Sequence, residues 1–164
     1  MKTVSGLILA LGLIGAAGLA QAQQLEQWGT AAGWDVMIDP SLGDGCLIQA
    51  AYQDGSVVRI GFDRLAGDGY ITAFNDAWGD IEEGGVYDIQ FVLDGEEFEG
   101  EAIGIYLNDV PGADIHFDST DFLFAIAEKI NMTLYSEYGE VMSIDLGGTY
   151  TGLEAVIACQ EEMG

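Results

Sequence analysis

The sequence contains very little positive charge. Lysine and arginine together number 4, against 28 aspartates and glutamates, and the formal net charge at pH 7 is −24. Such a chain repels the phosphates of nucleic acids and the anionic headgroups of lipid surfaces, which excludes both as partners. Two interpretations of the acidic residues remain. They can attract cations or a basic protein, or they can form a solvated surface that keeps the protein soluble in salty surroundings.

Histidine is almost absent, which limits the possible chemistry. Nucleophilic catalysis of the Ser-His-Asp or Cys-His type needs a base, and His116 is the only histidine. No serine stands in a G-x-S-x-G motif, and the chain has neither a P-loop nor a dinucleotide-binding fingerprint. These observations exclude the common nucleophilic and nucleotide-dependent enzymes. We expect no cofactor, with a divalent cation as the one alternative.

The first 22 residues have the composition of a signal peptide. Lys2 precedes an apolar stretch, Leu7–Leu19, and Ala20-Gln21-Ala22 fits the A-x-A cleavage pattern. The apolar stretch is shorter than the roughly 20 residues of a spanning helix, and nothing later in the chain resembles a span. We therefore predict a periplasmic or secreted protein, with residues 23–164 forming a single β-rich domain and no transmembrane segment after cleavage.

Only two cysteines occur, Cys46 and Cys159, and we predict that they form a disulfide. An exported protein with an even cysteine count usually pairs them. A bridge over so long a loop contributes about 4–5 kcal/mol in the chain-entropy model. The alternative is a reactive thiol, but neither cysteine has a base or a cation beside it in the sequence to activate it.

Alternating hydrophobic residues and Asp-Gly turns predict antiparallel strands. Asp54-Gly55 separates two strand-like runs, Cys46–Gln53 and Ser56–Asp63, and Asp94-Gly95 marks a second hairpin. Such dipeptides supply the positive φ angles of a type I′ turn. In the first hairpin Val58 and Ile60 alternate with polar residues, as in a sheet with one buried face.

Three segments are expected outside the centre of this sheet. Residues 23–30 are polar and are predicted to form a mobile lead-in. Asn108–Gly112 is predicted to be a loop that Pro111 keeps out of the sheet, because proline lacks the backbone N–H that a ladder needs. Ala113–Phe117 is predicted to be a short edge strand.

The hydrophobic period changes to about 3.6 in the last third of the chain. Leu123, Ile126 and Ile130 fall on one stripe of a helix, and Thr151–Glu154 fits the capping box of a second helix that ends near Glu162. Strands followed by helices predict an α+β fold that is predominantly antiparallel β, either a sandwich or a meander sheet, with two helices in the C-terminal third.

Asp114, His116 and Asp118 are the candidate metal ligands. On a strand the three side chains share one face, where two neighbours at i and i+2 can hold a divalent cation together with a third ligand from elsewhere. In the alternative interpretation His116 is a solvated strand residue and Asp118 caps the following helix.

Arg59 is the candidate binding residue. It can hold an acidic group of a ligand, or it can pair across strands with a ladder of carboxylates such as Glu97, Glu99 and Glu101. Pairing is the simpler interpretation.

Two motifs resemble those of uncharacterised small exported proteins of proteobacteria. The first is G-C-x-I-x-A-x-Y-x-D-G-S-x-x-R-I-G-F, from Gly45 to Phe62, and the second is L-G-G-x-x-x-x-L-x-x-V-x-x-C, from Leu146 to Cys159. The chain more distantly resembles the invasion-associated locus B family and the type VI secretion-associated periplasmic proteins. The resemblance implies a disulfide-bonded β-sandwich without established catalysis.

Two functional hypotheses follow. The lack of catalytic motifs and the cross-linked scaffold favour a non-enzymatic exported domain that binds an unknown protein or envelope component. The alternative is a metal- or carboxylate-dependent hydrolase that uses His116 with Asp114 or Asp118.

Overall fold

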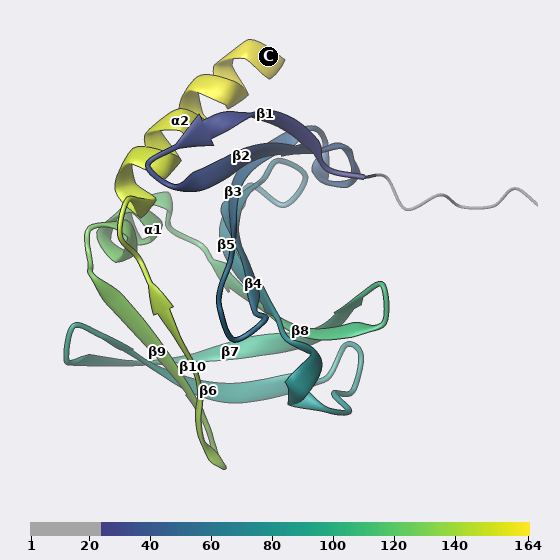
Figure 1. The fold of residues 1–164 in the computed structure, drawn as a ribbon, viewed down its shortest axis with the longest axis vertical. Coiled ribbons are helices and arrows are strands. Elements are labelled where there is room, and N and C mark those ends of the chain that lie inside the picture. The colour runs from purple at the N-terminus through teal and green to yellow at the C-terminus, as the bar shows by residue number, and fades with distance from the viewer. Residues whose placement is uncertain (1–23) are drawn as a thin grey trace, which may run out of the picture.

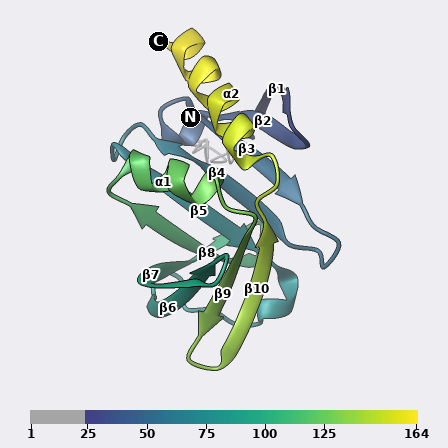
Figure 2. The ribbon, with the colours of Figure 1, turned by 90° about the vertical axis from the view of Figure 1, so that its left-hand side faces the viewer.

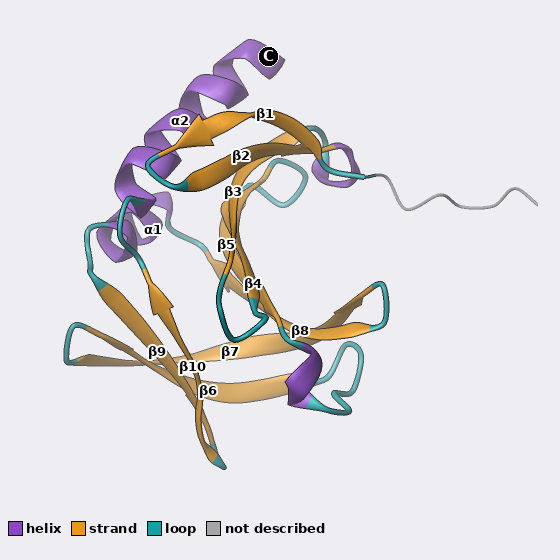
Figure 3. Ribbon diagram, in the orientation of Figure 1, coloured by secondary structure: helices purple, strands orange, loops and turns teal. Residues whose placement is uncertain are grey.

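One continuous antiparallel sheet dominates the computed structural model, which describes residues 24–164; the predicted signal peptide lies outside these residues. The strand order is β1-β2-β3-β4-β5-β8-β7-β6-β9-β10 (Figures 1 and 3). In chain order the strands are β1 (Glu26–Ala31), β2 (Trp34–Asp39), β3 (Gly45–Ala51), β4 (Val57–Asp63), β5 (Asp68–Phe74), β6 (Val86–Leu93), β7 (Glu96–Leu107), β8 (Val110–Phe117), β9 (Asn131–Ser136) and β10 (Gly139–Asp145).

Two α-helices lie on the same side of the sheet (Figure 2). They are α1 (Thr120–Ala127) and α2 (Thr149–Met163), and two short 3-10 helices, η1 (Pro40–Leu42) and η2 (Asp76–Trp78), connect strands. The predicted α+β class, mostly antiparallel β with two helices in the C-terminal third, is confirmed. The strands β1 to β5 follow one another as a meander, whereas β8 lies beside β5 and interrupts that order. Neither α-helix combines the length and the apolar character needed to cross a bilayer.

The sheet is strongly bent, and only one of its faces carries the main core. Figure 1 shows β1 and β2 above, β3 to β5 in the middle and β6 to β8 below, with α1, α2, β9 and β10 closing one side. Val58 and Ile60 of β4 point to that side, as predicted, and are buried against the helices. The helices contribute Leu123 and Leu153, each 0–1% exposed, to the same cluster. The opposite face has neither α-helix over it.

The two Asp-Gly hairpins form, but their turns differ. Asp94 (φ 49°) and Gly95 (φ 92°) make the predicted two-residue turn between β6 and β7. Between β3 and β4 the loop spans residues 52–56, and of the dipeptide only Gly55 has a positive φ. Asp54 instead accepts hydrogen bonds from the backbone and hydroxyl of Ser56, both at 2.9 Å. A longer turn closed by these bonds replaces the predicted type I′ form.

The predictions for Pro111 and for the short edge strand were wrong. β8 is an interior strand that pairs with both β5 and β7, and Pro111 lies opposite Tyr106 near its start. The hairpin before it is closed by Asn108 (φ 51°) and Asp109 (φ 68°), a left-handed pair without glycine. Because asparagine and aspartate tolerate this conformation, a tight turn forms where the sequence suggested a loop.

Two helix and strand boundaries also differ from expectation. Within the predicted lead-in, residues 26–30 belong to edge strand β1, which pairs with β2. The helix α2 starts at Thr149, after Gly148 in the left-handed conformation and without a side-chain cap, so the predicted capping box was wrong. Ile130 lies beyond the end of α1 and is 67% exposed rather than part of its buried stripe.

Replacing Gly112 by alanine should lower the free energy of unfolding by about 1–3 kcal/mol. A Cβ at this position in β8 would lie 2.7 Å from Cε1 of Phe74, closer still to its Cδ1, and 2.9 Å from the Ala73 carbonyl. The paired strands must move apart to accept it. Urea unfolding measures the change, with Gly29→Ala as control, since nothing lies within 4 Å of a Cβ there. Equal midpoints for the two variants would contradict the close packing.

Candidate functional site

The strand register aligns polar and apolar side chains into rows across the face of the sheet that lacks the helices. Paired residues in neighbouring strands project to the same side. One row runs through Asp35, Gln49, Arg59, Thr72, Asp114, Ile103 and Val86. The row on one side of it consists of Met37, Leu47, Gly61, Tyr70 and His116. The row on the other side consists of Ala51, Val57, Phe74, Gly112 and Ile105. We call the surface formed by these three rows the open face.

A pocket of about 180 Å³ lies on the open face. Its walls come from the end of β2, from η1 and from β4, β5, β7 and β8, so residues distant in the sequence meet there. Those that matter most for its chemistry are Asp39, Arg59, Tyr70, Phe74, Ile105 and Asp114.

Arg59 is held in a fixed position in this pocket. Its Nε donates a hydrogen bond of 2.9 Å to Oε1 of Gln49, and its Cζ lies 5.4 Å from the centre of the Phe74 ring. Burial lowers the pKa of Arg59, and nearby Tyr70 and Asp39 act in the opposite direction. Because an arginine pKa starts so high, the guanidinium stays charged at neutral pH.

No carboxylate forms a salt bridge with Arg59 among residues 24–164. Its nitrogens have no acidic oxygen within 4.0 Å there, and Nε makes the only hydrogen bond of its side chain. The predicted pairing with the glutamate ladder was wrong, because β5 and β8 separate β4 from β7. The interpretation of Arg59 as a ligand-binding residue is therefore the one that stays open.

Tyr70 and Asp39 lie beside Arg59 and are almost completely buried, at 4% and 8% exposure. Oδ1 of Asp39 accepts hydrogen bonds from the backbone (2.9 Å) and the hydroxyl (2.5 Å) of Ser41, which fixes η1 over the pocket. Burial, together with neighbouring carboxylates, raises the pKa of Tyr70. Its hydroxyl is therefore neutral and able to donate a hydrogen bond.

Asp114 and His116 lie together at the edge of the pocket, but Asp118 does not join them. Nε2 of His116 is 2.7 Å from Oδ2 of Asp114, and its Nδ1 is 3.0 Å from Oδ2 of Asp68. Asp118 is exposed after the end of β8, and Ser119 caps α1 in its place. Asp68 was missed because only the pairing of β5 with β8 brings it near the histidine.

This arrangement does not support the predicted metal site at Asp114, His116 and Asp118. Both ring nitrogens of His116 are engaged by carboxylates, whereas a metal-binding histidine needs one nitrogen free for the ion. Asp114 also accepts a hydrogen bond of 2.7 Å from the Thr72 hydroxyl. Within residues 24–164 no group of three or more His, Cys, Asp or Glu side chains is placed to hold a metal ion.

The contribution of His116 to stability should decrease as the pH rises. Burial lowers the pKa of His116, but the charges and hydrogen bonds of Asp114 and Asp68 outweigh burial, so the pKa lies above its usual 6.5. The protonated ring then stabilises the folded state fully below pH 6.5, and this contribution is lost as the pH rises through the folded-state pKa.

Thermal unfolding between about pH 6 and about pH 9 tests this expectation, because carboxylates and tyrosines keep their charge state there. The midpoint of the wild type should fall with rising pH more steeply than that of His116→Asn. Parallel pH profiles would show that the ring has no such role.

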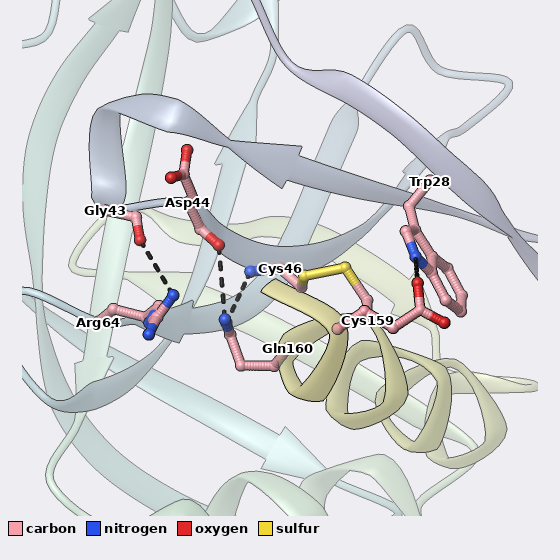
Figure 4. The surroundings of a disulfide bond; sticks show 8 residues. Trp28, Gly43, Asp44, Cys46, Arg64, Cys159 and Gln160 are labelled. Carbon is pink, nitrogen blue, oxygen red and sulfur yellow. Dashed lines mark hydrogen bonds between the residues drawn. A yellow bond between two sulfur atoms is a disulfide. The ribbon is translucent and has the colours of Figure 1, made fainter. Parts of the chain in front are cut away.

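The predicted disulfide between Cys46 and Cys159 is present, with a Cα–Cα distance of 6.2 Å (Figure 4). It ties β3 to α2, and both cysteines are fully buried. Gln160, the next residue of α2, accepts a hydrogen bond of 3.0 Å from the Cys46 backbone. Trp28 of β1 donates one of 2.8 Å to Glu162. The bridge is thus part of the scaffold and lies away from the pocket.

Comparison with solved structures finds a similar fold. The chain matches the crystal structure of invasion associated protein B from Bartonella henselae with a TM-score of 0.56 and 14% sequence identity, over 85% of this chain and 99% of that one. No protein-family model and no curated protein sequence matches. The likeness to type VI secretion-associated proteins stays a prediction. The predicted resemblance to the invasion-associated locus B family is confirmed at the level of the fold, and the chain has the fold of invasion associated protein B.

Proposed function

We propose that this protein is an exported, non-enzymatic binding domain that holds a protein or envelope component on the open face of its sheet. The observation that carries the proposal is the state of Arg59. In a chain with 28 acidic residues, this half-buried cation faces a pocket and has no carboxylate within 4.0 Å among the described residues. Gln49 and Phe74 hold its side chain in place, so the charge is available to a ligand without rearrangement.

The disulfide supports localisation of the protein outside the cytoplasm. A buried disulfide of this kind persists in oxidising compartments and is rare in reducing ones. The fold of invasion associated protein B agrees with this assignment. Together with the predicted signal peptide, these features favour a periplasmic or secreted protein.

The hydrolase hypothesis has weaker support. His116 is bound on both sides by carboxylates, and its predicted partner Asp118 lies elsewhere. A salt-bridged imidazole of this kind links β5 to β8 and is a poor metal ligand or base.

Mild crosslinking of the native envelope, followed by mass spectrometry, tests the binding function. The wild type and two variants, Arg59→Gln and Arg64→Gln, are compared. Arg64 is a matched control because it is exposed and donates to the carbonyl oxygens of Gly43 and Gly164, outside the pocket. We expect one reproducible partner with the wild type and with Arg64→Gln, and its loss with Arg59→Gln. Failure to recover a reproducible partner, or the same partner from all three proteins, would contradict the proposal.

A further inference from the structure

We propose that the Arg59 pocket binds a single carboxylate group that is carried on an apolar body. This inference rests on the proposed function, because it names the chemistry that the open face would recognise.

Arg59 lines the pocket, and its guanidinium is a planar fork of hydrogen-bond donors. Its Nε is occupied by Gln49, and the ring of Phe74 lies beside its Cζ, which leaves the two terminal nitrogens for a ligand. A planar carboxylate can accept parallel hydrogen bonds from such a pair of donors. The Tyr70 hydroxyl in the same pocket is neutral and provides a further donor.

The carboxylates around the fork disfavour a ligand with two negative charges more than a ligand with one. Asp39, Asp63 and Asp114 line the same pocket as Arg59. A phosphate monoester carries nearly two negative charges at pH 7. These carboxylates would repel such a group more strongly than they repel a carboxylate, which carries one charge.

Part of the surface next to the pocket is apolar, although Glu101 and Asp88 lie beside it on the same face. Phe74 and Ile105 form the wall beside Arg59, and Ile103 and Val86 continue from Asp114 along the central row of the open face. Ile103 is 40% exposed and Val86 is 62% exposed, so this part of the face is accessible to a ligand. It runs across β7 and β6.

The size of the pocket indicates how a ligand would lie. A volume of about 180 Å³ is below the roughly 300–1,000 Å³ of pockets that enclose a whole small molecule. The pocket therefore accepts the carboxylate head, and the body extends over Ile105, Ile103 and Val86. Both a free aliphatic acid and the C-terminus of an apolar peptide have this chemistry.

Titrations of the purified exported protein, followed by NMR, test the inference. The probes are hexanoate, hexanol, hexyl phosphate, and an acetylated Ala-Leu-Leu peptide with either a free or an amidated C-terminus. We expect hexanoate or the free-acid peptide to shift the Arg59 Nε–H and the methyl groups of Ile103 and Ile105. Hexanol, hexyl phosphate and the amide should bind at least about tenfold more weakly, as expected for loss of a charge-assisted hydrogen bond or for added repulsion. Whichever binds more tightly, hexanoate or the free-acid peptide, indicates whether the bound carboxylate belongs to an aliphatic acid or to a peptide C-terminus.

Variants distinguish the contribution of the ligand's carboxylate to binding from that of its apolar body. Arg59→Gln should abolish the shifts, Arg59→Lys should weaken binding because it loses the fork, and Arg64→Gln should leave binding unchanged. Ile103→Ser should weaken hexanoate but not acetate. Thermal midpoints confirm that each variant is folded.

The inference is overturned if hexanol binds as well as hexanoate, if Arg59→Gln binds hexanoate like the wild type, or if no carboxylate shifts the open face. If the carboxylate titrations fail in this way but a partner is still crosslinked and depends on Arg59, the proposed binding function stands. Only the proposal that the ligand is a carboxylate is then removed. The reverse combination, carboxylate binding without a crosslinked partner, would remove the proposed envelope partner and keep the site.

Discussion

Replacing Cys46 and Cys159 together by alanine should lower the free energy of unfolding by about 4–5 kcal/mol. The bridge joins residues 113 apart in sequence, and the entropy that it removes from the unfolded chain grows with the length of the loop. Domains of this kind are stable by only about 5–15 kcal/mol, so the variant should lose a large share of its stability. Urea unfolding of the oxidised wild type and of the variant measures the difference between their midpoints.

Reduction provides an independent check on the same bridge. The reduced wild type should unfold near the midpoint of the double variant, since both lack the cross-link. The intact mass of the exported protein should rise by two hydrogen atoms on reduction, one for each sulfur. Free thiols in the non-reduced protein, or a double variant as stable as the wild type, would contradict the structural role of the disulfide.

Replacing Phe91 by alanine should cost about 3–5 kcal/mol of stability. Phe91 of β6 is 3% exposed, and its ring lies 5.3 Å from that of Phe98, 6.3 Å from that of Phe117 and 6.4 Å from that of Phe122, centre to centre. These rings join β6, β7 and β8 to α1. The cavity left by the ring cannot be filled without moving several elements at once.

The control for Phe91 is Val86→Ala in the same strand. Val86 is 62% exposed, so its truncation should change the free energy of unfolding far less, by about 0.5 kcal/mol or less. Chemical unfolding of both variants gives the comparison. Similar losses of stability in the two variants would show that the packing of Phe91 against Phe98, Phe117 and Phe122 does not stabilise the fold as expected.

Local patterns were sufficient for the hairpin at Asp94-Gly95 and for the place of Cys159 on the buried side of its helix. Asp94-Gly95 provides two residues that adopt positive φ at low cost, and the strands on either side alternate between buried and exposed residues. Cys159 falls on the buried stripe of α2, where the helical period places it next to Leu153 and Val156. In each case neighbouring residues determine the structure.

The arrangement of the strands was not predictable in the same way. β8 lies between β5 and β7, and this order depends on contacts between residues far apart in the chain. The turn at Asn108 and Asp109 lacks the glycine that marks the other hairpins, so the local signal for β8 was missing as well. β1 is polar because it lies at the edge of the sheet.

The candidate site depends on this order of strands, which explains why only some of its residues could be named. Arg59 and His116 were found because arginine and histidine are scarce. Their partners were not: Gln49 and Phe74 beside Arg59, and Asp68 beside His116, come from neighbouring strands. The sequence alone could not show that two strands, β5 and β8, lie between Arg59 and the glutamates expected to pair with it.

Binding of a partner on the open face is tested most directly by site-specific photocrosslinking in cells. A photoreactive amino acid is placed at Ile103 on the open face or at Ile157 on α2, two positions that are equally exposed at 40%. We predict one discrete adduct from position 103, its loss when Arg59 is also replaced by glutamine, and no adduct from position 157. An adduct from position 157 alone, or equal adducts from both positions, would contradict the assignment of the open face as the binding surface.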